Sequence, residues 1–115
     1  MNDLEKKRSE KEHQENFDRA FAKLSSGQAR FFLMLNHVPR IAELWDIENR
    51  ELKVESFEKA LGVMSSGEIH IAKFFAAVWF HDNQRYGFDL IDAVSSIDSE
   101  HSKLIIEWIS DPFWP

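Results

Sequence analysis

The residues best suited to chemistry in this chain form a His-Asp pair, His81-Asp82. Imidazole and carboxylate together bind hard or borderline cations, and helical metal-dependent phosphohydrolases combine a His, a His-Asp dipeptide and a distant Asp. The residues that flank the pair do not resemble that family, and five His among 115 residues make one such pair unsurprising. A small metal-dependent hydrolase is therefore an alternative hypothesis. Its candidate ligands are His37, His81, Asp82, Asp92 and Asp98.

A second acidic pair, Asp89 and Asp92, has the three-residue spacing that places two side chains on one helix face. Such a pair can perform general acid–base chemistry or bind a metal. Acids in the first turn of a helix also interact favourably with the positive end of the helix dipole, and we favour this structural role. We therefore predict no catalytic, cofactor-binding or metal-ligating residue, and no cofactor.

The tryptophans offer a different kind of site. Trp45 closes a short predicted helix at 41–45, and Trp114 lies with Phe113 in a proline-rich tail. Exposed Trp side chains commonly anchor protein partners, but these could equally cover the ends of a helical bundle. Both interpretations stay open. The interaction candidates are Trp45, Asp89, Asp92, Phe113 and Trp114.

An internal repeat shows which elements must position these residues. The segment 17–28, FDRAFAKLSSGQ, returns 40 residues later as FEKALGVMSSGE at 57–68, with five of twelve positions identical. Each copy has helical apolar spacing followed by a Ser that begins a capping box, Ser25 with Gln28 and Ser65 with Glu68. A weaker third copy begins at Leu90, and Asp98 caps its second helix. We predict an all-α, compact bundle of about six helices, built from two repeated hairpins and a degenerate third.

Composition sets the limits of the domain. Residues 17–115 predict a single helical domain, and residues 1–16 predict a charged extension that is either helical or disordered. A hydrophobic share of 43% with ten Phe supports a core without metal or disulfide, since there is no Cys. Residues 48–53 are the predicted exposed connector. The longest apolar run, 69–80, is too short to span a bilayer, so we expect a cytoplasmic protein without membrane contact.

The charge of the chain bears on its partners. The formal net charge is −6, and residues 79–115 hold seven acidic residues against Arg85 and Lys103. Nucleic-acid backbones require a clustered basic face, so we expect no nucleic-acid partner. Acidic mimicry of nucleic acid remains an alternative. It requires one continuous stripe of carboxylates from Asp89, Asp92, Asp98, Glu100 and Asp111.

The segment 66–92 carries a recognisable pattern. It has a Ser-Gly-Glu start at Ser66, Phe74 and Trp79 toward the end of the helix, a polar loop and a Gly-Phe-Asp-Leu-x-Asp turn at 87–92. It resembles a family of small uncharacterised bacterial proteins associated with plasmids, integrating elements and prophages. This chain has Phe80-His81 where the family tends to have Trp-Asn, and Tyr86-Gly87 where it tends to have paired Gly. The resemblance implies a mobile-element origin, and it implies no activity.

Taken together, the residues favour a non-enzymatic protein-interaction or regulatory protein of a bacterial mobile element. The chain offers no nucleophile with an adjacent base and no phosphate loop, while its acidic C-terminal third and aromatic tail suit an unidentified protein partner. Helices that are apolar on every face can also be buried by a second copy, so a homodimer is a further prediction.

Overall fold

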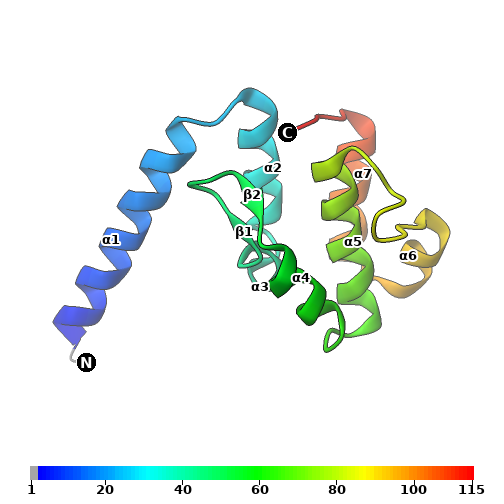
Figure 1. Ribbon diagram of the computed structural model, residues 1–115, viewed down its shortest axis with the longest axis horizontal. Coiled ribbons are helices and arrows are strands. Elements are labelled where there is room, and N and C mark those ends of the chain that lie inside the picture. The colour runs from blue at the N-terminus through cyan, green and yellow to red at the C-terminus, as the bar shows by residue number, and fades with distance from the viewer. Residues whose placement is uncertain (1–2) are drawn as a thin grey trace.

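A computed structural model describes residues 3–115 as a helical body from which the first helix projects (Figure 1). The prediction of an all-α fold is confirmed, because the regular structure of the described chain consists of seven helices and one small hairpin of two two-residue strands. The elements in chain order are α1 Asp3–Ala22, α2 Ser26–Leu35, α3 Pro39–Ala42, β1 Trp45–Asp46, β2 Glu51–Leu52, α4 Val54–Leu61, α5 Ser66–Phe80, α6 Leu90–Ser96 and α7 Ser99–Ser110.

The repeat corresponds to the helix–turn–helix segments α1–α2 and α4–α5, each with the predicted capping box. The Gln28 N–H donates to Ser25 Oγ and the Ser25 N–H donates to Gln28 Oε1, at 3.2 and 3.1 Å. The second box is formed in the same way by Ser65 and Glu68. These side chains satisfy backbone donors that a helix start leaves free, which fixes where α2 and α5 begin. In the third pair, α6–α7, Asp98 is the N-cap of α7, and its carboxylate accepts the His101 N–H at 2.9 Å.

The core lies where α2, α5 and the short hairpin meet. Phe31 is fully buried at its centre, and its ring lies 4.9–5.8 Å from four other aromatic rings. Near-perpendicular ring pairs such as Phe31–Phe75, at 89°, place the positive edge of one ring on the negative face of the next. Those four rings belong to Phe32, Trp45, Phe75 and Trp79.

The prediction that residues 48–53 form an exposed connector is wrong for the end of this segment. Its end forms β2, which pairs antiparallel with β1 so that Leu52 lies opposite Trp45, and both side chains are buried. The predicted helix at 41–45 is correspondingly shorter, because α3 ends at Ala42. At the hairpin turn the Asp46 carboxylate accepts two hydrogen bonds from Asn49, which lower the pKa of Asp46 below its ordinary value.

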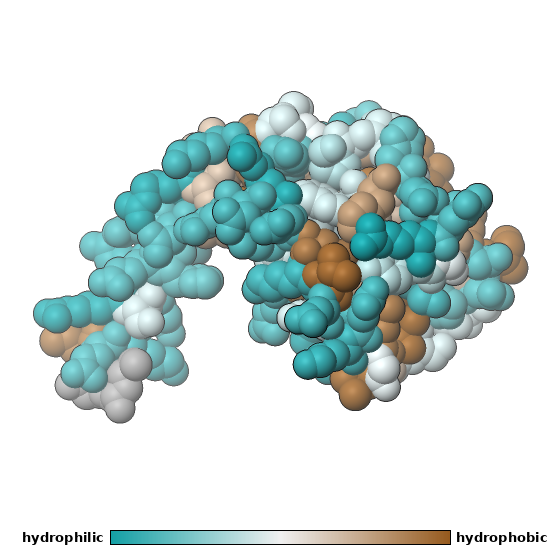
Figure 2. All heavy atoms as spheres, viewed as in Figure 1, coloured by the Kyte–Doolittle hydropathy of each residue, from teal (hydrophilic) through white to brown (hydrophobic). Residues whose placement is uncertain are grey.

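The charged extension is helical from Asp3 onward. Helix α1 runs without a break past residue 16, and Ala20 is its only buried side chain. Figure 2 shows it covered largely by hydrophilic side chains. Three exposed apolar side chains, Leu90, Ile91 and Val94, lie on α6. The domain boundary at residue 16 stays a prediction. Across residues 3–115, no helix combines the length and apolar character required to cross a membrane.

Candidate functional site

The last helical turn of α5 carries the first component of the candidate site. His81 caps α5 with φ 55°, a left-handed conformation usually taken by Gly or Asn. Its backbone N–H donates to the carbonyl oxygens of Ala77 and Val78, which ends the helix. The imidazole then stacks on the Trp114 indole, with ring centroids 3.7 Å apart and an interplanar angle of 22°. A strained backbone at a non-Gly residue commonly marks a functional position. The surface next to His81 is therefore a candidate site.

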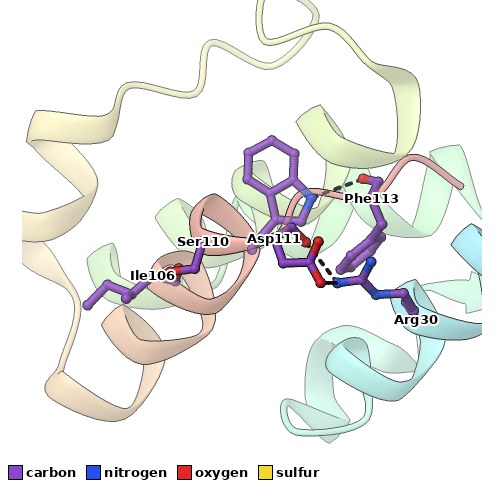
Figure 3. A network of polar contacts seen from close by, with 6 residues as sticks. Arg30, Ile106, Ser110, Asp111 and Phe113 are labelled. Atoms are coloured by element: carbon purple, nitrogen blue, oxygen red, sulfur yellow. Dashed lines mark hydrogen bonds and ion pairs between the residues drawn. The ribbon is translucent and has the colours of Figure 1, made fainter.

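The second component is the C-terminal tail, which packs against α2 and α7. Arg30 donates to the Asp111 carbonyl oxygen at 2.8 Å and to Asp111 Oδ2 at 3.0 Å, and its guanidinium lies 4.6 Å from the centre of the Phe113 ring (Figure 3). The Trp108 indole N–H donates to the Phe113 carbonyl oxygen at 3.0 Å. Phe113, one of the interaction candidates predicted from the sequence, is therefore buried rather than presented to solvent.

A close backbone contact fixes the end of the tail. A Cβ built on Gly27, at the start of α2, would lie 2.1 Å from the Trp114 carbonyl oxygen, so only glycine fits there. The side chain of Trp114 itself is 47% exposed. The tail thus holds a half-exposed indole in a defined place, and its role as an interaction anchor stays a prediction.

These components line an open aromatic pocket of about 390 Å³ between the C-terminal half of α5, the loop 81–88, α7 and the tail. Consecutive rings in its wall are steeply inclined, since Phe74 and Trp108 meet at 81° and Trp108 and Trp114 at 84°. The wall is therefore built of edge-to-face ring pairs, and the His81 imidazole covers one face of the Trp114 indole. The residues that line the aromatic pocket are Phe74, Ala77, Val78, His81, Asp82, Asn83, Phe88, Trp108 and Trp114.

The polar part of the aromatic pocket is confined to its rim. Asp82 Oδ1 accepts the Gln84 N–H at 2.8 Å, which shapes the turn that follows α5. His81, Asp82 and Asn83 are all exposed. Among the described residues that line the aromatic pocket there is neither Lys nor Arg, and no Ser, Thr, Cys or Tyr. The rim therefore carries a carboxylate without a nucleophilic hydroxyl or thiol beside it.

The other acidic candidates have local structural roles. Asp89 is the N-cap of α6, and its Oδ1 accepts the Asp92 N–H at 2.9 Å. Asp98 caps α7, and Asp111 pairs with Arg30. The acidic pair Asp89 and Asp92 thus organises a helix start, in agreement with the structural interpretation of its spacing.

Trp45 does not lie on the surface. It is 5% exposed, and its ring packs at 5.5 Å from Phe31 and 5.8 Å from Phe57. The exposed-anchor interpretation of Trp45 is wrong, because pairing of β1 with β2 draws this side chain into the core. Of the three aromatic candidates, only Trp114 presents a substantial surface to solvent.

The proposed metal ligands do not converge. No group of three or more His, Cys, Asp or Glu side chains among residues 3–115 is arranged to hold a metal ion. His37 lies just beyond α2, whereas Asp98 caps α7 and His81 caps α5. The hydrolase hypothesis therefore has no candidate centre in the part of the chain that the structure describes.

Two further hollows lie between α1 and the body. Figure 2 shows the notch between the projecting helix and the body. The smaller, of about 500 Å³, has mainly polar walls, including Arg19, Lys23 and Arg50. The larger, of about 740 Å³, mixes apolar and charged walls from α1, α2 and β1. Neither has the concentration of rings that distinguishes the aromatic pocket.

Sequence reasoning missed most of the aromatic pocket. Phe74 and Trp108 carry the helical spacing of core residues, and nothing local distinguishes a ring that lines a pocket from one that fills the core. Phe88 lies in the Gly-Phe-Asp-Leu turn, whose residues give no local sign of a pocket. Comparison with protein-family models, with curated proteins and with solved structures finds no match. The family resemblance of 66–92 accordingly stays a prediction.

Proposed function

We propose that this chain is a non-enzymatic protein-interaction module, acting in the cytoplasm as an accessory or regulatory protein of a bacterial mobile element. Its partner docks at the aromatic pocket. The observation that carries the proposal is the half-exposed Trp114 indole, held at the pocket by the His81 stack and the Trp108 ring. The mobile-element part rests on the resemblance of residues 66–92.

Energetics favour this surface as a binding site. Interface hot spots are enriched in Trp and lie in well-packed apolar pockets. An anchor whose position is already fixed loses little conformational freedom on binding, which leaves more of the contact energy as affinity. Trp114 fits this description because its backbone abuts Gly27 and its ring is stacked.

The alternatives lack comparable support. A hydrolase would need the ligand group that residues 3–115 do not form. An acidic mimic needs one continuous stripe of carboxylates, whereas those of Asp89 and Asp98 accept hydrogen bonds at two separate helix starts and that of Asp111 pairs with Arg30. A homodimer would use the apolar side chains exposed on α6 and α7, and equilibrium sedimentation over a range of concentrations would detect it. These side chains are Leu90, Ile91, Val94, Ile106 and Ile109.

Affinity capture with matched variants tests the proposal. Wild-type chain, Trp114→Ala and Leu33→Ala are used to capture proteins from a bacterial lysate, and retained proteins are identified by mass spectrometry. Leu33 is the control because it is 56% exposed on α2 and does not line the aromatic pocket. We expect a protein that wild type and Leu33→Ala retain and Trp114→Ala loses. The proposal fails if folded Trp114→Ala retains every protein that wild type retains.

A further inference from the structure

The aromatic pocket combines ring faces with a carboxylate, and this combination selects a particular ligand chemistry. Ring faces carry negative potential and attract cations, most strongly over Trp. Two Trp and two Phe rings line the pocket together with the exposed Asp82 carboxylate. No described Lys or Arg side chain lines it, so a cation entering the pocket would meet no fixed positive charge there.

The segment 79–115, which supplies six of the nine residues that line the aromatic pocket, is also acidic. The seven acidic and two basic residues of 79–115 give this part of the chain a formal charge of −5. One of the two bases, Arg85, lies over the Phe80 ring at 4.3 Å and the Tyr86 ring at 5.6 Å, outside the pocket. A field of this sign steers basic partners toward the surface and disfavours acidic ones.

The molecule already contains the arrangement that such a ligand would adopt. Arg30 places its guanidinium over the Phe113 ring and donates to the Asp111 carboxylate at 3.0 Å (Figure 3). A planar guanidinium can stack on a ring and bind a carboxylate at the same time, which a compact ammonium does less well. The aromatic pocket offers these two components, a ring wall and the Asp82 carboxylate, without an internal arginine to occupy them.

We propose that the aromatic pocket binds an arginine side chain of the protein partner, with the guanidinium against the Trp rings and within reach of Asp82. The inference rests on the proposed function and names the chemistry of the docking segment. A volume of about 390 Å³ accommodates one long side chain and its immediate backbone. The partner is therefore a protein with an exposed arginine in a basic segment.

Titration of the full chain with short capped peptides tests this inference. The probes are glycyl-arginyl-glycine and its citrulline counterpart, which has nearly the same shape but no charge. The indole N–H resonances of Trp108 and Trp114 report occupancy in ¹⁵N-labelled protein. A single side chain should bind with a Kd on the order of 1 mM. We expect the arginine peptide to shift both resonances and the citrulline peptide to bind at least about tenfold more weakly.

Two variants complete the test. Asp82→Asn should weaken the arginine peptide about five- to tenfold, because a neutral amide replaces the charged acceptor. Leu33→Ala should bind as wild type does. Equal binding of arginine and citrulline peptides, or no indole shift with either, would overturn the inference. The proposed function is tested separately by capture with Trp114→Ala. A partner that docks through an apolar side chain would contradict the arginine inference while leaving the proposed docking site unchanged.

Discussion

The His81 imidazole lies face to face with the Trp114 indole, 3.7 Å between ring centroids. This stack joins the end of α5 to a tail 33 residues further along the chain. It also forms the part of the aromatic pocket where the tail meets the loop after α5. The exposed Trp therefore depends on a residue that simultaneously ends a helix.

Replacing His81 by Asn separates these two roles. Asn tolerates the left-handed backbone at this position, so α5 should still end correctly, while the stacked ring is lost. We expect the free energy of unfolding to fall by about 0.5–1.5 kcal/mol. Acrylamide quenching of Trp fluorescence should increase, because Trp114 is the most exposed of the four Trp residues.

A double-mutant cycle provides the control for His81→Asn. If the loss arises from the stack, His81→Asn should have little effect on stability when Trp114 is already Ala. Strict additivity of the two free-energy changes would show that the substitution acts through the backbone instead.

Gly27→Ala tests how the tail is held. Alanine normally stabilises a helix relative to glycine by about 1 kcal/mol, but here its Cβ would lie 2.1 Å from the Trp114 carbonyl oxygen. We expect the tail to be displaced and capture of the Trp114-dependent partner to be lost, while helix content measured by circular dichroism is retained.

Gly62→Ala is the matched control for Gly27→Ala. Gly62 has φ −73°, and an added Cβ would meet only the Lys59 carbonyl oxygen at 3.4 Å. We expect unchanged capture and a free energy of unfolding that is equal or higher by about 0.4–1 kcal/mol. Loss of capture in both variants would mean that the effect is not specific to the tail.

The features that sequence predicted correctly are those set by neighbouring residues. Both capping boxes depend on a Ser and a side chain three positions later, so Ser25 and Ser65 could be assigned without tertiary information. Trp45 was harder, because its burial depends on pairing with Leu52 across a hairpin. The aromatic pocket was missed for the same reason, since α5, a loop, α7 and the tail contribute to it.

The two capping boxes differ in their third helical residue, which is the neutral Gln28 in α2 and the ionisable Glu68 in α5. This difference leads to a prediction about pH dependence. Hydrogen bonding from Ser65 lowers the pKa of Glu68 below its ordinary value of 4.5, with a smaller contribution from Arg40. A lowered folded-state pKa stabilises the fold above the unfolded-state pKa, and that stability is lost as the pH falls through the folded-state value. Glu68→Gln should therefore lose less stability than wild type between pH 7 and about pH 3, as measured by urea unfolding.

The first repeat supplies the reverse experiment. Gln28→Glu converts the neutral box of α2 into the acidic form found in α5, and it should steepen the loss of stability toward acid pH. Identical pH profiles for wild type, Glu68→Gln and Gln28→Glu would show that the box carboxylate does not contribute to acid sensitivity.

Phe31→Ala tests the contribution of the aromatic core. Phe31 is fully buried and contacts rings from α2, β1 and α5, so its removal leaves a cavity that several elements would have to fill. We expect a loss of about 3–5 kcal/mol, measured by urea unfolding. Leu33→Ala, from the same helix, should change stability by less than about 0.5 kcal/mol because its side chain is exposed. Comparable losses for the two variants would contradict the assignment of the core to the α2 face that carries Phe31.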